Sequence, residues 1–257
     1  MTANTKIEWA DATWNPITGC SPVSEGCANC YAARMAKRLA GRCGYDADDP
    51  FQVTIHRDRL DDPLRWRKAR RVFVCSMGDL FHEDVPFHKI SAVWDVMFDA
   101  PQHTYMILTK RPARAAEFAS WMDDVGRRID YPNVWLGVTA ENQTMLDKRV
   151  PALFSIPAAV RFVSCEPLLG LVDLRFEAAW DLTDSGFAHG PAVINLDWVI
   201  CGSESGPGAR PMHSDWARAL RDQCVAAGVP FFLKQMDVDG ELVKLPALDG
   251  RVWDQTP

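Results

Sequence analysis

Three cysteines lie close together near the start of the chain, at Cys20, Cys27 and Cys30. Their spacing is C-x6-C-x2-C, and a segment with helical character follows directly. Thiols this close together can form a disulfide, bind zinc, hold an iron–sulfur cluster, or simply be buried as small apolar side chains. The composition of the whole chain and the residues elsewhere in it decide between these four interpretations.

The composition argues against a disulfide. The chain has 257 residues, of which 47% are hydrophobic, so a sizeable core can form without covalent cross-links. The first residues lack the basic start and apolar run of a secretory signal, and no stretch of about eighteen apolar residues occurs. We therefore expect a cytoplasmic protein that does not bind membranes. In that compartment clustered cysteines are metal ligands or catalytic groups more often than disulfides.

The number of cysteines separates zinc from an iron–sulfur cluster. A [4Fe–4S] cluster normally takes four thiolates, so three cysteines leave one iron without a protein ligand. An open iron is what a chelating cofactor needs, and the missing ligand therefore favours the cluster. A zinc site needs a fourth ligand from a distant histidine, and a zinc-stabilised regulatory protein without enzymatic activity remains the alternative. The candidate histidines are His56, His82 and His88.

Short apolar or β-branched segments recur along the chain, each with the length of a buried strand. They are residues 12–17, 71–76, 103–108, 133–138, 160–165, 196–201 and 229–234. Segments with helical periodicity lie between them, at residues 86–100, 111–125 and 214–228. This alternation predicts an α/β fold, a partial (β/α) TIM-like barrel of about six to seven parallel strands. An open doubly wound sheet is the alternative, although no G-x-G-x-x-G follows any strand.

The chain reads as one domain over residues 1–257. Two stretches break the strand–helix alternation, and we expect them to be insertions, at residues 43–71 and 172–195. The tail at residues 236–257 is polar and carries no clear pattern.

Polar side chains follow the predicted strands at the points where the strands end. Because ligands of parallel α/β folds bind at the carboxyl ends of the strands, we expect these side chains to share one edge with the cysteines. The strand-end polar residues are Asp79, Lys110, Arg111, Thr139, Glu141, Asn142, Glu166, Glu204, Arg210, Lys234 and Gln235. Three further cysteines also lie at strand ends, at Cys75, Cys165 and Cys201.

The net charge of −6 does not by itself indicate nucleic-acid binding. Positive charge is nevertheless concentrated in two segments, residues 56–71 and 109–114. These are either solvated helix faces or a local basic rim for a substrate that carries phosphate.

Several blocks of the sequence resemble those of a phage-associated three-cysteine family of radical-SAM-like proteins of unknown function. The blocks are WNPITGC…CANCYA, SMGDLFH, LTKRP, NVWLGVTAEN, RFVSCEPLLG, GSESGPGARP and PFFLKQ. The resemblance covers nearly the whole chain, although the usual radical S-adenosylmethionine (SAM) spacing is C-x3-C-x2-C and this chain has three more residues in the first gap. The segment NPITGC…CANCYAARM is also similar, more faintly, to spore photoproduct lyase-like proteins.

The resemblance implies a radical SAM enzyme in which Cys20, Cys27 and Cys30 hold a [4Fe–4S] cluster and SAM binds the open iron. The reduced cluster would cleave SAM and give a 5′-deoxyadenosyl radical, which takes a hydrogen atom from the substrate. A reduced protein of the flavodoxin or ferredoxin type would supply the electron. The residues that the resemblance implies for SAM are Met77, Gly78, Asp79, Thr139, Glu141 and Asn142.

The same resemblance gives candidates for the reaction on the substrate. We expect Lys110, Glu166 and Cys165 to be catalytic, the last as a donor of a hydrogen atom. The basic segments and the fainter resemblance favour a nucleic-acid base or nucleotide, which the enzyme would modify or repair. A peptide or a small molecule is the enzymatic alternative. The substrate side of the mouth would be lined by Arg111, Glu204, Arg210, Lys234 and Gln235.

Overall fold

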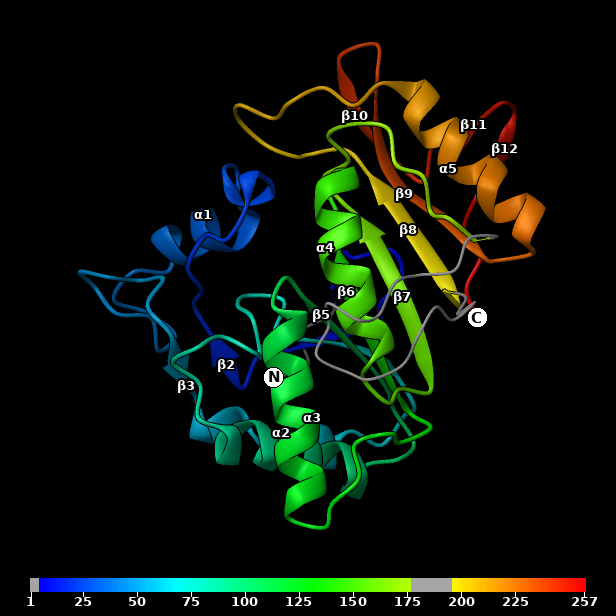
Figure 1. Cartoon of the computed structure of the whole chain (residues 1–257). Helices are drawn as coiled ribbons and strands as arrows, with labels where there is room; N and C mark the ends of the chain where they lie inside the picture. The colour runs from blue at the N-terminus through cyan, green and yellow to red at the C-terminus, as the bar shows by residue number, and fades with distance from the viewer. Residues whose placement is uncertain (1–4, 177–195) are drawn as a thin grey trace.

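The computed structural model describes residues 5–176 and 196–257, and its central feature is one curled sheet (Figure 1). The strand order is β1-β4-β5-β6-β7-β8-β9-β10. Each neighbouring pair from β1 to β9 is parallel, whereas β10 is antiparallel to β9. The predicted partial barrel is therefore confirmed. The strands are β1 Ala12–Trp14, β4 Arg71–Val74, β5 Thr104–Thr109, β6 Val134–Thr139, β7 Val160–Cys165, β8 Trp198–Gly202, β9 Phe231–Val238 and β10 Glu241–Lys244.

Helices α2 to α5 cover the outer face of the curled sheet, and α1 stands apart from it (Figure 1). The helices are α1 Tyr31–Arg38, α2 Phe87–Asp99, α3 Pro112–Asp124, α4 Gln143–Phe154 and α5 Ser214–Ala227. Three short 3₁₀ turns are η1 Glu25–Cys27, η2 Arg57–Arg59 and η3 Pro63–Arg65. The sequence did not predict α4, because Pro151 lies inside it and proline is disfavoured in helix interiors.

The strands separate the hydrophobic core into two clusters. Buried side chains of α2 to α5 belong to the larger cluster, on the outer face of the sheet. The smaller cluster contains alternate strand residues such as Met106, Phe162 and Trp198, and it fills the concave face. Trp9, just before β1, packs on Phe73 and Trp198 at centroid distances of 4.8 and 6.2 Å. This N-terminal segment therefore closes the amino end of the half-barrel and leaves the carboxyl end for the site.

The segments outside the strand–helix alternation contain short strands of their own. Residues 43–71 contain β3 Thr54–Ile55, which pairs with β2 Ile17–Thr18 in a small antiparallel sheet. The C-terminal tail extends the main sheet through β10, and β11 Ala247–Leu248 pairs with β12 Arg251–Val252. Trp253 of this tail is buried. Most of the insertion predicted at residues 172–195 lies outside the described residues.

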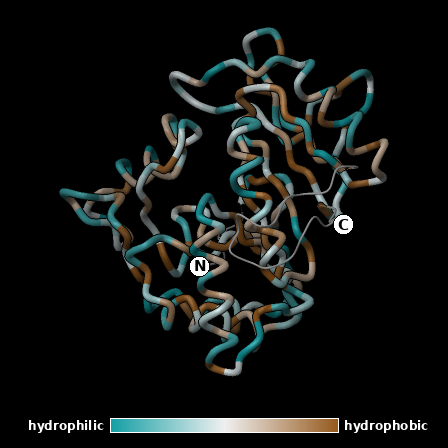
Figure 2. The backbone as a smooth tube through the Cα atoms, viewed as in Figure 1, coloured by the Kyte–Doolittle hydropathy of each residue, from teal (hydrophilic) through white to brown (hydrophobic). Residues whose placement is uncertain are grey.

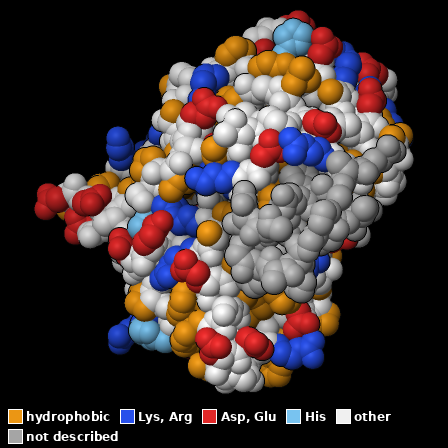
Figure 3. All heavy atoms as spheres, in the orientation of Figure 1, with side chains coloured by type: hydrophobic (Ala, Val, Ile, Leu, Met, Phe, Trp, Pro, Cys, Tyr) orange, Lys and Arg blue, Asp and Glu red, His pale blue; other side chains and the backbone are white. Residues whose placement is uncertain are grey.

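The distribution of polarity fits an α/β protein. Hydrophobic residues follow the strands, and hydrophilic ones follow the outer loops (Figure 2). Basic and acidic side chains are interspersed over the visible face (Figure 3). None of the helices within the described residues has the length and apolar character needed to cross a membrane.

Candidate active site

The three cysteines lie on one loop between β2 and α1, which we define as residues 19–30 and call the cysteine loop. Its first residue, Gly19, has a φ of +89° and donates its N–H to the carbonyl of Met77 at 2.9 Å. A Cβ atom on Gly78 would lie 2.8 Å from the carbonyl oxygen of Gly19. Met77 and Gly78, predicted to contact SAM, therefore form the backbone support on which the loop begins.

The thiols of the loop differ in environment from the other cysteines. Cys20, Cys27 and Cys30 are free and half-buried, so they are within reach of a ligand that enters from solvent. Cys27 ends the turn η1 and Cys30 directly precedes α1. Of the remaining thiols, Cys43 is exposed and the other four are fully enclosed, at Cys75, Cys165, Cys201 and Cys224.

Arg111, at the end of β5, holds the first part of the cysteine loop. Its guanidinium donates to the Cys20 Sγ at 3.2 Å and to the carbonyl and hydroxyl oxygens of Ser21 at 3.0 and 2.9 Å. Its Nε donates to both carboxylate oxygens of Glu83 at 3.0 Å. Burial and the nearby Asp79 carboxylate raise the pKa of Cys20 to about 11, and Arg111 opposes this rise.

Asp79 is buried beside this arginine and fixes the end of β5. Its carboxylate accepts hydrogen bonds from the Thr109 hydroxyl at 2.8 and 3.0 Å and from the backbone N–H of Lys110 at 3.2 Å. Arg111 donates to the same carboxylate at 3.4 Å. Asp79 therefore sets the conformation of the two residues that follow β5. The SAM contact predicted for it stays a prediction.

Glu141 and Asn142, after β6, hold the middle of the loop. Glu141 accepts from the backbone N–H of Gly26 at 3.3 Å and from Arg149 of α4 at 2.7 Å, and both side chains of this ion pair are buried. Burial raises the pKa of Glu141, but hydrogen bonding and the Arg149 guanidinium outweigh it and lower the pKa overall. Asn142 caps α4 by accepting from the N–H of Met145, and its amide donates to the Glu25 carboxylate.

Glu204 and Arg210, after β8, hold the end of the loop. The Glu204 carboxylate accepts from the Asn29 amide at 2.8 Å and from the Arg210 guanidinium at 2.6 and 3.0 Å. Arg210 also donates to the backbone carbonyl of Glu25 at 3.0 Å. Burial raises the pKa of Glu204, yet these donors outweigh it and hold the pKa at about 2. Both residues have hydrogen bonds to the cysteine loop, and the substrate contacts predicted for them stay predictions.

A second set of predicted residues lies on the concave face of the sheet. This is the face that also carries the smaller hydrophobic cluster. The Lys110 ammonium lies 3.5 Å from the Thr139 hydroxyl, at the ends of β5 and β6. Across the mouth, Lys234 forms an ion pair with Glu166. The Gln235 amide donates to Glu166 at 3.4 Å and to the Ser203 carbonyl at 2.8 Å. These residues, unlike those above, make no described contact with the cysteine loop.

Cys165 is the predicted residue whose position does not fit its role. It is fully buried in the larger hydrophobic cluster, on the side of the sheet that faces the helices. Burial raises the pKa of its thiol to about 12. Because successive residues of a strand point to opposite faces, Ser164 and Glu166 face the concave side and Cys165 does not. Its position therefore gives no support to hydrogen-atom transfer to a substrate in the mouth.

The three loop thiols are the type of donor that iron–sulfur clusters take. Within residues 5–176 and 196–257, no three His, Cys, Asp or Glu side chains converge as ligands of one ion. The thiolates of a [4Fe–4S] cluster bind different irons and therefore stand further apart than the ligands of one ion. Three free thiols on one loop, one of them facing a guanidinium, match that donor set.

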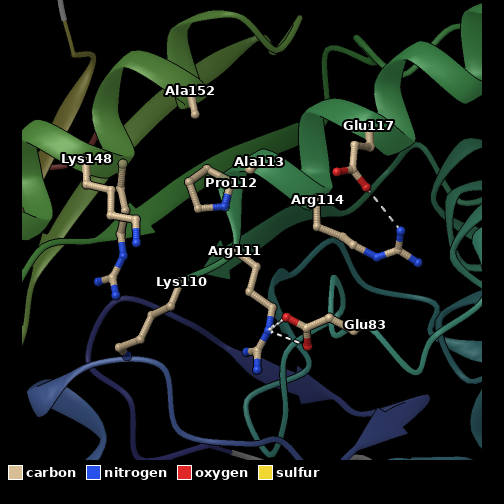
Figure 4. Close-up of a pocket in the computed structure, with 10 residues that line it drawn as sticks. Glu83, Lys110, Arg111, Pro112, Ala113, Arg114, Glu117, Lys148 and Ala152 are labelled. Atoms are coloured by element: carbon tan, nitrogen blue, oxygen red, sulfur yellow. Dashed lines mark hydrogen bonds and ion pairs between the residues drawn. The ribbon is translucent and has the colours of Figure 1, made fainter. Parts of the chain in front are cut away.

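A groove of about 470 Å³ opens beside the mouth, between the start of α3 and one side of α4 (Figure 4). Arg114 on its wall pairs with Glu117 at 3.2 Å, and its guanidinium lies 4.2 Å from the ring centroid of Phe87. Among the described residues, no carboxylate lies within ion-pair distance of Lys110 or Lys148. The charged lining consists of Lys110, Arg111, Arg114, Lys148, Arg149, Glu83 and Glu117. The groove therefore has an excess of positive charge on a chain that is acidic overall.

The model of one protein family matches residues 4–257, and its description is "Protein of unknown function (DUF5131)". The chain belongs to this family. No curated protein matches the sequence significantly. The association with phage that the sequence blocks implied stays a prediction.

The chain is similar to two solved structures of spore photoproduct lyase. A mutant form is 11% identical with a TM-score of 0.50, and a complex with a dinucleoside spore photoproduct is 12% identical with a TM-score of 0.49. Each alignment covers 87% of this chain and 63% of the other chain. At this identity the likeness shows the fold alone.

Sequence reasoning missed the residues that complete these contacts. Asn15 accepts from the Met77 backbone N–H at 2.9 Å, Asn29 donates to Glu204, and Arg149 neutralises Glu141. Asn15 and Asn29 lie in the blocks WNPITGC and CANCYA, so the blocks marked them without indicating their partners. Arg149 lies on α4, which the sequence did not predict.

Proposed function

We propose that this chain is a radical SAM enzyme in which Cys20, Cys27 and Cys30 hold a [4Fe–4S] cluster whose open iron binds SAM. The observation that carries the proposal is the cysteine loop itself. It presents three free, half-buried thiols at the carboxyl edge of a parallel half-barrel, and side chains from three separate strand ends hold it there. Such extensive fixing suits a loop that must keep a cofactor in one position.

When bound, the cluster and SAM supply the difficult chemistry, because reductive cleavage of SAM gives a radical that removes hydrogen from an unactivated carbon. The chain itself has to bind, orient and enclose the reactants. Arg111, Glu141 and Glu204 fix the loop, each from a different strand end. Five polar side chains of the concave face are Lys110, Thr139, Glu166, Lys234 and Gln235, and we assign SAM and substrate binding to this set.

We propose a nucleic-acid base or nucleotide as the substrate. The groove beside the mouth supports this choice, because Lys110 and Lys148 offer ammonium groups with no carboxylate partner among the described residues. Phosphate is bound by such groups without regard to base sequence. Lys110 lies both in this groove and beside Thr139, so a phosphate in the groove would place the attached base near the mouth.

A reduced flavodoxin or ferredoxin is the proposed electron donor, and a cytoplasmic location follows from a cluster that needs a reducing compartment. The half-buried thiols support direct reduction, because the loop lies at the surface of the mouth. A protein of this class that reduces the loaded chain anaerobically would support the assignment.

The reaction tests the proposal. The chain is reconstituted anaerobically with iron and sulfide, reduced with dithionite, and incubated with SAM, and 5′-deoxyadenosine is measured by chromatography. We expect release by the wild type, none by Cys27→Ala, and normal release by the matched control Cys43→Ala, since Cys43 is exposed and outside the cysteine loop. A wild-type chain with an intact cluster that releases no 5′-deoxyadenosine would refute the enzymatic proposal.

A further inference from the structure

One of the contacts by which Arg111 holds the cysteine loop is made to a thiol. Its Nη1 lies 3.2 Å from the Sγ of Cys20, and only 5% of its side chain is exposed. The same guanidinium is fixed by Glu83, by Asp79 and by the backbone carbonyl of Ser21. Because groups on several sides hold the planar guanidinium, the N–H that faces the sulfur cannot turn away from it.

A cationic donor beside a thiolate has an electrostatic consequence. A hydrogen bond from a guanidinium stabilises negative charge on the sulfur more than a neutral donor does. One-electron reduction of a [4Fe–4S] cluster adds one negative charge, so the same donor stabilises the reduced form more than the oxidised form. Hydrogen bonds to the sulfurs and net charge are among the factors that set the potential of such clusters.

We propose that Arg111 is a positioning residue that fixes Cys20 as a cluster ligand and raises the reduction potential of the cluster. In the half-reaction, one electron from a flavodoxin- or ferredoxin-class donor enters the cluster, and no bond of the chain forms or breaks. The carboxylates of Asp79 and Glu83 lie against the same guanidinium. Loss of Arg111 would therefore leave two negative charges near the cluster and disfavour reduction further.

This inference rests on the proposed function, since it requires that Cys20 ligates the cluster. The test measures the midpoint potential of the anaerobically reconstituted full chain by redox titration followed with electron paramagnetic resonance. Arg111→Gln removes the charge, and Arg111→Lys keeps it without the planar fork. Arg114→Gln is the matched control, because Arg114 lies one turn along α3, carries the same charge and has no described contact with a thiol.

We expect Arg111→Gln to lower the equilibrium constant for reduction of the cluster at least tenfold. For a one-electron couple this lowers the midpoint potential by about 59 mV or more. Arg111→Lys should lie between this variant and the wild type, and Arg114→Gln should stay within about threefold of the wild type. If Arg111→Gln fails to bind iron, the Lys variant decides the matter.

A fully loaded Arg111→Gln chain with the wild-type midpoint would overturn the inference. A loaded Arg111→Lys chain with the wild-type midpoint would do so when the Gln variant does not load. A wild-type chain that binds no iron at all would refute the proposed function instead, so the two failures are distinguishable.

Discussion

The ion pair between Glu141 and Arg149 gives the sharpest test of how the cysteine loop is held. The two side chains are 0% and 3% exposed, and their charged atoms lie 2.7 Å apart. The pKa of Glu141 is lowered overall, so its carboxylate is charged at pH 7. Removing one member of a buried pair leaves an uncompensated charge and typically costs about 3–5 kcal/mol. We expect this loss of unfolding free energy for Glu141→Met or Arg149→Met alone.

The double variant separates the ion pair from the other contacts of these residues. It leaves no uncompensated charge, but the Gly26 N–H loses its acceptor and the Thr139 carbonyl loses a donor. Such unsatisfied groups cost about 1–3 kcal/mol. The double variant should therefore be more stable than either single variant, and the coupling energy should be several kcal/mol. Urea denaturation of the metal-free chain at pH 7 measures all four corners of the cycle.

A surface pair provides the control for this cycle. Arg128 and Asp130 lie 2.6 Å apart, but their side chains are 81% and 34% exposed. A solvated pair contributes about 0–1 kcal/mol, so its coupling energy should stay within that range. If the coupling energy between positions 141 and 149 is no larger than that of the surface pair, the Glu141–Arg149 ion pair does not stabilise the region that holds the cysteine loop.

Glu204 gives a pH prediction: its pKa, about 2 against an ordinary 4.5, means that its stabilisation is complete above pH 4.5 and is lost as the pH falls towards 2. Glu204→Gln should lower the free energy of unfolding by about 2 kcal/mol at pH 7, after allowance for the partly exposed Arg210. The unfolding free energies of wild type and variant, measured by urea denaturation, should become equal as the pH falls from 4.5 towards 2. A difference between them that stays constant with pH would contradict this prediction. Lys148→Glu should weaken anisotropy-monitored binding of a single-stranded oligonucleotide and reduce its log–log salt slope by about 0.7 or more, whereas an unchanged slope would remove the groove from the binding surface. Gly137→Ala should lower the free energy of unfolding by about 1–3 kcal/mol, because its Cβ would lie 2.4 Å from the Phe162 ring. Gly170→Ala should be nearly neutral, because the space around Gly170 is open. Equal unfolding free energies for the two variants would contradict the packing described for Gly137.

The sequence was most informative where burial alone decides the structure. Residues 160–165 were predicted as a strand and form β7 over the same residues, because a short apolar run in a parallel sheet is buried on both faces. The β10 to β12 segments were not predicted. β10 is exposed along its whole length and pairs with the adjacent β9, while β11 and β12 have two residues each, so no buried apolar run marks these segments in the sequence.

The site was predictable as a set of residues but not as a set of contacts. The carboxyl ends of parallel strands share one edge, so Glu141 and Glu204 were expected near the cysteines. Their partners on the cysteine loop, Gly26 and Asn29, are 115 and 175 residues away in sequence, and no local pattern specifies such pairs. The alternation of side chains along β7 could have predicted one further point. It places Cys165 and Glu166 on opposite faces of the sheet, so the two cannot both face the mouth.

The metal content of the anaerobically reconstituted chain tests the central claim most directly. Iron, acid-labile sulfide and zinc are measured per chain. The electron paramagnetic resonance spectrum of the reduced protein is recorded before and after SAM is added. We predict about four irons and four sulfides, a spectrum that changes on addition of SAM, and loss of the cluster in Cys27→Ala. A colourless chain with stoichiometric zinc and no iron, or a Cys27→Ala variant with full cluster content, would contradict the account.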